Sequence, residues 1–335
     1  MPQRPLALFA MRAENPPRLF PPGALARLRA SVDIDPALVA EDFRDPRVRD
    51  ALAGAEILIT GWGSPPVDDA ALRAAPRLRA VLHAAGSVKS LLTPGCWERG
   101  LLVSSAADAN ALPVAEYTLG MIMLAGKNLF AARDGYRAAR TFAPAEIIPD
   151  IGNFGRRIGV VGASRIGRRL IELLRPFDFR VSLADPYVDA AGAAALGVTL
   201  RDLDDLLRTS DIVTVHAPAT PETYKLIGRR ELALLGDGTV LVNTARGSLV
   251  DTPALVAELR TGRVSAVLDV TDPEPLPPDS PLFDLPNAFL TPHLAGSQGN
   301  ELRRLGLCVV DEVERLLRGV PLAHRVDRAE LERAA

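Results

Sequence analysis

Short apolar runs bounded by glycine or proline recur along this chain, and three of them follow one another in its second half. They cover Thr239–Val242, Val264–Leu268 and Ala288–Leu290. Runs of this length are typical of strands in a buried parallel sheet, which helices cover on both faces. The sequence therefore predicts an α/β fold in which these three strands belong to one parallel sheet.

A side chain with useful chemistry follows each of these strands: Arg246, Glu274 and His293. Open α/β sheets bind ligands at the carboxyl ends of their strands, so we expect the three to gather there. Arginine can grip a carboxylate bidentately and histidine can move a proton. A nearby glutamate orients the imidazole and favours its charged form. Each residue alone is more often an ordinary loop residue, but together they predict reduction of a 2-keto acid.

A second arrangement upstream predicts the cofactor. The strand Arg157–Val161 leads into the turn Gly162-Ala-Ser-Arg-Ile-Gly167 and then into a helical run, Arg168–Leu174. Such a turn places a pyrophosphate at the helix amino terminus. The next strand, Arg180–Ala184, ends in Asp185, which can accept hydrogen bonds from ribose hydroxyls and repels a 2′-phosphate. NAD is therefore predicted in preference to NADP.

The turn departs from the dinucleotide-binding pattern at one position, because Ser164 replaces the middle glycine. That glycine normally lets the backbone approach the phosphates closely. Two interpretations of the serine stay open: its hydroxyl bonds a phosphate oxygen, or it merely fills space.

In these segments the chain resembles the D-isomer-specific 2-hydroxyacid dehydrogenases, which include D-3-phosphoglycerate dehydrogenases, glyoxylate and hydroxypyruvate reductases, D-lactate dehydrogenases and formate dehydrogenases. The resemblance covers nearly the whole length and includes Ala84–Val88, Asn110–Thr118 and Val215–Pro218. It implies two Rossmann-like domains with parallel sheets, an active site in the cleft between them, NAD as cofactor, and a homodimer formed through the NAD-binding domain.

The resemblance also implies a role for individual residues. The catalytic residues would be Arg246, Glu274 and His293. Substrate would be bound by Trp62, Gly63, Gly86, Ser87 and Arg246, although Trp62 is equally well explained as a packing residue. Cofactor would be bound by Gly162, Ser164, Arg165, Ile166, Gly167, Asp185, His216, Ala217, Pro218, Thr244, Ala245, Asp269, His293 and Gly296. Of the other histidines, His83 is expected in a core and His324 in solvent.

The order of elements predicts a discontinuous first domain. Before residue 110 we expect strands at Leu6–Ala10, Glu56–Thr60 and Arg79–His83, with helices at Gly23–Ala30 and Val67–Ala74. A long helix, Pro113–Phe130, would begin the second domain after a crossover at Asn110, and the helix Gln298–Leu317 would return to the first. The prediction is a substrate-binding domain of residues 1–109 plus 297–335 and an NAD-binding Rossmann domain of residues 110–296.

Composition excludes several other classes of function. A net charge of −2 gives no electrostatic reason to bind nucleic acid or an acidic membrane. No apolar run approaches the roughly 20 residues of a membrane span, and the amino terminus lacks the core of a secretory signal. Cys96 and Cys308 have no metal-ligand spacing, so we expect reduced thiols, no metal and a cytoplasmic protein. No regulatory domain is expected after residue 325.

One alternative comes from a different functional class. NAD(H)-sensing transcriptional corepressors resemble this family, but the complete Arg–Glu–His set and the lack of a basic tail favour an enzyme. The sequence leaves the substrate open among glyoxylate, hydroxypyruvate, phosphohydroxypyruvate and larger keto acids.

Overall fold

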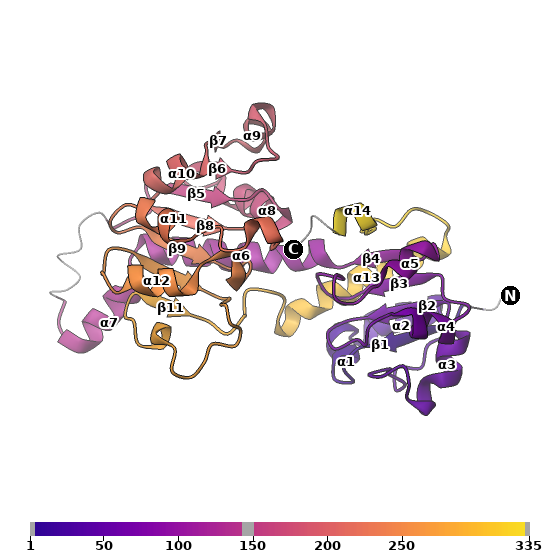
Figure 1. Cartoon of the computed structure of the whole chain (residues 1–335). Helices are drawn as coiled ribbons and strands as arrows, with labels where there is room; N and C mark the ends of the chain where they lie inside the picture. Colours follow the sequence, from indigo (N-terminus) through magenta and orange to yellow (C-terminus); the bar gives the residue numbers. More distant parts are fainter. Residues whose placement is uncertain (1–3, 143–150, 332–335) are drawn as a thin grey trace. The chain divides into compact units, whose positions relative to one another are not determined.

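The computed structural model describes residues 4–142 and 151–331. The chain divides into two compact units, which are coloured along the sequence in Figure 1. One unit contains the described residues up to Asn110 and those from Ser297 onward, and the other contains Ala111–Gly296. Each is built around a parallel sheet, so the predicted fold class is confirmed. Within the described parts of the chain, no helix is both long and apolar enough to cross a membrane.

The first unit contains a four-stranded parallel sheet in the order β1-β2-β3-β4. Its strands are β1 (Ala7–Ala10), β2 (Ile57–Thr60), β3 (Ala80–His83) and β4 (Leu102–Ser105). Its helices are α1 (Asn15–Leu19), α2 (Pro22–Ser31), α3 (Arg49–Gly54), α4 (Asp69–Ala74), α5 (Pro94–Glu98), α13 (Leu302–Leu317) and α14 (Arg328–Leu331), with short 3-10 turns at Pro46–Val48 and Gly299–Glu301. The strands β1, β2 and β3 are buried throughout, as expected for a sheet covered on both faces.

The second unit contains a seven-stranded parallel sheet in the order β11-β10-β9-β8-β5-β6-β7. Its strands are β5 (Arg157–Val161), β6 (Arg180–Ala184), β7 (Thr199–Leu200), β8 (Ile212–Val215), β9 (Val240–Asn243), β10 (Ser265–Leu268) and β11 (Ala288–Leu290). The chain runs outward from β5 through β6 and β7, then returns to the other side of β5 with β8. The carboxyl ends of β5 and β8 therefore flank the point where the strand order reverses, which is where doubly wound sheets bind ligands.

Helices connect these strands. They are α6 (Ala107–Gly126), which begins just before this unit, α7 (Leu129–Ala139), α8 (Arg165–Leu174), α9 (Ala190–Leu196), α10 (Leu203–Thr209), α11 (Arg229–Leu234) and α12 (Thr252–Leu259). Short 3-10 turns lie at Pro221–Thr223, Gly247–Leu249 and Pro281–Phe283.

Several predicted helix boundaries are wrong, and caps explain most of the differences. The long helix begins at Ala107, so Asn110 lies within α6 rather than in a crossover loop. It ends at Gly126, because Asn128 adopts a left-handed conformation before α7. The helix α4 begins at Asp69 because the Asp68 carboxylate caps it, and α8 begins at Arg165 because Ser164 caps it.

The helix α13 packs against helices near the start of the chain. In Figure 1, α13 in yellow lies beside the indigo helices of the first unit, and it contacts α1 and α2. It buries Leu305, Val309 and Val313 in one core with residues of β1 and α1. A Cβ on Gly306 would overlap the carbonyl oxygen of Leu19, so α13 and α1 approach closely only with glycine there. The predicted helix start at Gln298 is wrong: α13 begins at Leu302, after a 3-10 turn.

Candidate active site

The register of three neighbouring strands brings the predicted catalytic loops to one edge of the sheet. Asn243 at the end of β9 is opposite Leu268 of β10, and Leu268 is opposite Leu290 of β11. The three strands are parallel, so the loops that carry Arg246, Glu274 and His293 all leave from this edge.

The imidazole of His293 is held by the carboxylate of Glu274. Nδ1 of His293 lies 2.5 Å from Oε1 of Glu274. The two side chains are 51% and 42% exposed, so solvent screens the pair and it contributes little to the free energy of unfolding. The hydrogen bond instead orients the imidazole of His293. It occupies Nδ1, and Nε2 remains available for proton transfer.

The backbone of His293 is strained, and the surrounding hydrogen bonds hold it. Its φ of 54° lies in the left-handed region, which is uncommon for residues other than glycine. Its N–H donates to the carbonyl oxygens of Asp269 and Thr291. The buried Asp269 carboxylate accepts the N–H groups of Leu294 at 2.7 Å and Ala295 at 2.8 Å. The strain at the candidate proton donor is therefore held in place by Asp269.

The Arg246 loop is closed by Asn243. The Asn243 amide donates to the carbonyl oxygen of Arg246 at 2.8 Å, and its oxygen accepts the N–H of Ala245 at 3.1 Å. A Cβ on Gly247 would overlap the carbonyl oxygen of Thr271. The Arg246 loop thus packs directly against the loop that leads to Glu274, and glycine is required at the contact.

The glycine turn after β5 is tight, and its serine has a clear structural role. Gly162 has a φ of 97°, and a Cβ on Gly167 would overlap the Gly162 carbonyl oxygen. Ser164, by contrast, has a φ of −61°, which any residue adopts. Its hydroxyl accepts the N–H of Gly167 at 3.3 Å and so caps α8. A serine is therefore compatible with this backbone.

Asp185 and His216 both border that turn. Oδ2 of Asp185 accepts the N–H of Ala163 at 2.6 Å, and Oδ1 accepts the N–H of Tyr187 at 2.8 Å. Each oxygen keeps a lone pair for a further donor, such as a ribose hydroxyl. Burial lowers the pKa of His216 to about 3, and its Nδ1 has no partner within the described residues. A turn with no room for a Cβ at Gly162 or Gly167, a neighbouring carboxylate and an unsatisfied buried nitrogen together fit a dinucleotide.

The predicted substrate-binding residues other than Arg246 lie at strand ends of the first unit. Trp62 and Gly63 follow β2, and Gly63 has a φ of 78°. Gly86 and Ser87 follow β3, and the Ser87 hydroxyl accepts the N–H of Lys89. The Trp62 side chain is 39% exposed.

The two histidines of the first unit differ in their surroundings. His83, at the end of β3, is buried as expected, and its Nδ1 lies 2.9 Å from the Thr60 hydroxyl. Burial lowers the pKa of His83 to about 4. His324, which was expected in solvent, is partly exposed, and its Nδ1 lies 3.0 Å from a carboxylate oxygen of Asp108.

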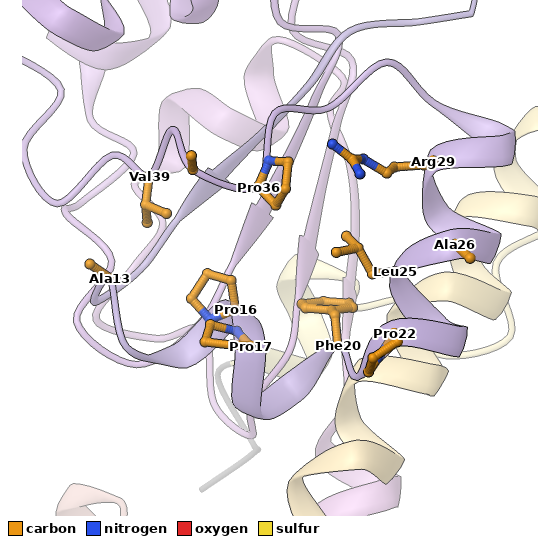
Figure 2. Close-up of a pocket in the computed structure, with 11 residues that line it drawn as sticks. Ala13, Pro16, Pro17, Phe20, Pro22, Leu25, Ala26, Arg29, Pro36 and Val39 are labelled. Atoms are coloured by element: carbon orange, nitrogen blue, oxygen red, sulfur yellow. The ribbon is translucent and has the colours of Figure 1, made fainter.

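Figure 2 shows a hollow of about 710 Å³ in the first unit. The rings of Pro16, Pro17, Phe20 and Pro22 border it, and the Arg29 side chain extends over one end. None of the predicted catalytic, substrate-binding or cofactor-binding residues lines this hollow. The site is therefore defined by the strand-end loops rather than by this hollow.

Comparisons with known proteins identify the family. Residues 119–295 match the model of the D-isomer specific 2-hydroxyacid dehydrogenase NAD binding domain. A glyoxylate reductase of Korarchaeum cryptofilum is 31% identical over 276 residues, which are 82% of each chain. The chain belongs to the D-isomer specific 2-hydroxyacid dehydrogenase family. The cofactor of this NAD-binding domain is NAD, as predicted.

Other members of the 2-hydroxyacid dehydrogenase family resemble the chain. A D-3-phosphoglycerate dehydrogenase of Mycobacterium leprae is 39% identical over 268 residues, which are 78% of this chain and 49% of the relative. The chain thus spans about half the length of the phosphoglycerate dehydrogenases that it matches. The crystal structure of a phosphoglycerate oxidoreductase from Rhizobium etli has a TM-score of 0.82 at 25% identity, covering 97% of this chain and 99% of that one.

The structure adds supporting residues that the sequence analysis did not predict. Asn243 closes the Arg246 loop, and Thr291 donates to Asp269. Tyr117 and Thr118, which end the family-like segment Asn110–Thr118, bond to Thr291 and Thr244. The only sequence signal was their place beside motif residues, because nothing in the spacing connects α6 with loops more than a hundred residues away.

Proposed function

We propose that this chain reduces a 2-keto acid to a D-2-hydroxy acid with NADH. The observation that carries the proposal is the Glu274–His293 pair at the same sheet edge as the Arg246 loop. The relatives are named as dehydrogenases and reductases, so the corepressor alternative is not favoured.

The roles of the residues follow from their chemistry. The guanidinium of Arg246 binds the substrate carboxylate and polarises the keto oxygen. Nε2 of His293 donates a proton to that oxygen during reduction and removes it during oxidation. Glu274 holds the imidazole through Nδ1. NADH, when bound, supplies the hydride. We also propose that Trp62, Gly63, Gly86 and Ser87 bind the substrate.

A keto-acid panel tests the proposal. NADH oxidation is followed by absorbance with glyoxylate, hydroxypyruvate, phosphohydroxypyruvate and larger 2-keto acids, and the product is resolved by chiral chromatography. We expect turnover with at least one of them and a D-configured product from every keto acid that yields a chiral centre. Absence of turnover with the whole panel, or an L product, would contradict the proposal.

We also propose that the protein is a homodimer formed through the second unit, Ala111–Gly296, which is the NAD-binding unit. Large apolar side chains are exposed on α7 and beyond it, among them Tyr136, Phe142 and Phe154, the last 90% exposed. Light scattering during gel filtration should give twice the chain mass, and Phe154→Glu should lower the measured mass. A monomeric wild type would refute the dimer.

We propose a cytoplasmic location, supported by two free cysteines, Cys96 and Cys308.

A further inference from the structure

We propose that Tyr117 and Thr118, adjacent residues of α6, are positioning residues, each of which holds one catalytic loop. Tyr117 would hold the His293 loop, and Thr118 would hold the Arg246 loop. The inference rests on the proposed function for its kinetic consequences, and on the hydrogen bonds below for its structural basis. Tyr117, Thr118 and both loops lie within the NAD-binding unit.

The contact from Tyr117 has only one possible direction. The Thr291 hydroxyl lies 2.6 Å from Oδ1 of Asp269, and an ionised carboxylate only accepts, so Thr291 must donate to it. The single hydroxyl proton of Thr291 is then used. The Tyr117 hydroxyl oxygen lies 2.7 Å from the hydroxyl oxygen of Thr291, so Tyr117 must donate the proton in this hydrogen bond. Burial raises the pKa of Tyr117, so this donor stays protonated at neutral pH.

This relay ends at the strained histidine. Oδ1 of Asp269, which accepts the Thr291 proton, also accepts the N–H of Leu294 directly after His293. Thr291 itself lies two residues before His293, and its carbonyl oxygen accepts the His293 N–H. Removing the Tyr117 hydroxyl would leave Thr291 without its donor and loosen the turn that keeps His293 at a positive φ.

The contact from Thr118 is also directional. The Thr118 hydroxyl donates to the carbonyl oxygen of Val114 at 2.7 Å, one helical turn back. Its proton is used there, so the Thr244 hydroxyl, 2.8 Å away, must donate to Thr118. Both threonines are buried, where an unsatisfied hydroxyl is costly. Thr244 lies two residues before Arg246, so this bond fixes the start of the Arg246 loop.

Adjacent helical positions explain why the two hydroxyls reach different loops. Successive side chains on an α-helix point about 100° apart. Tyr117 and Thr118 therefore extend to the loops after β11 and β9, which are separated in the sheet by β10. The helix α6 thus positions both the loop of His293, the proposed proton donor, and the loop of Arg246, which is proposed to bind the substrate carboxylate.

Two substitutions separate the loops. Tyr117→Phe and Thr118→Val each remove one hydroxyl at nearly constant shape, Thr118→Ser keeps a hydroxyl, and Tyr224→Phe is the matched control. The Tyr224 side chain is exposed, and its hydroxyl makes no hydrogen bond within the part of the chain that is described. Amide hydrogen exchange is measured in peptides covering residues 291–296 and 243–247, with kcat, KM and the melting temperature.

We expect Tyr117→Phe to speed exchange at Leu294 and Ala295 about tenfold and to lower kcat by a similar factor, with little change in KM for the keto acid. Thr118→Val should speed exchange at the Ala245 N–H and raise the KM for the keto acid. Thr118→Ser should restore most of the wild-type exchange rate and KM. Unchanged exchange in both loops, or equal acceleration throughout the NAD-binding unit, would overturn the inference. A wild type with no turnover would refute the proposed function instead, while the exchange data would still decide the loop contacts.

Discussion

At the scale of single residues, His83 makes stability depend on pH. It is buried and neutral, and its pKa of about 4 lies below the 6.5 of an exposed histidine. Between these values the unfolded chain binds the additional proton, so the free energy of unfolding falls as the pH falls. Above about 6.5 both states are neutral and the effect vanishes. His216 acts in the same direction, since burial lowers its pKa to about 3.

Urea denaturation at several pH values between 7.5 and 5 measures this. Each buried histidine should add up to about 1.4 kcal/mol of slope per pH unit below pH 6.5. His83→Asn, which can keep a hydrogen bond to Thr60, should flatten the curve by that amount. Parallel curves for the two proteins would show that the pKa of His83 is the same in the folded and unfolded states.

We propose that Asp185 selects NADH over NADPH through repulsion between like charges. A 2′-phosphate beside its carboxylate would bring like charges together, so we expect NADH to be preferred over NADPH by roughly 100-fold in kcat/KM. Asp185→Ala should narrow that gap and also weaken NADH binding, because the carboxylate accepts the N–H of Ala163 in the turn. Equal kcat/KM for the two cofactors in the wild type would contradict this explanation.

At the scale of elements, Ser164 is the cap of α8. Glycine is an adequate cap, so Ser164→Gly should cost only a few tenths of a kcal/mol in unfolding free energy. It should change the NADH dissociation constant, measured by fluorescence titration, less than about tenfold. A larger loss of affinity would mean that the hydroxyl also bonds the pyrophosphate.

Strands were predicted closely and helix starts less so, for a physical reason. The strand Arg180–Ala184 was predicted with its observed bounds, because its apolar run ends at a charged residue. The start of α6 was missed because Pro113 resembles a helix start, while the chain tolerates it inside the helix at the loss of one hydrogen bond. The Tyr117 and Thr118 contacts depend on side chains meeting across the fold, which periodicity does not encode.

At the scale of the whole molecule, the end of the chain completes the first unit through α13. A Cβ on Gly306 would meet the backbone of Leu19, which cannot move aside easily. Gly306→Ala should therefore lower the free energy of unfolding by about 1–3 kcal/mol in urea denaturation. Gly23→Ala is the control, because nothing lies within 4 Å of its added Cβ. It should be neutral or stabilising by about 0.5–1 kcal/mol. Equal effects of the two changes would contradict the close packing of α13.

We propose that His293 transfers the proton in keto-acid reduction. The most direct test is the kcat of His293→Asn with the best substrate of the panel, since asparagine tolerates the positive φ and removes only the imidazole. We predict a loss of about 10²–10⁴-fold in kcat. Near-full turnover by His293→Asn would show that another group transfers the proton.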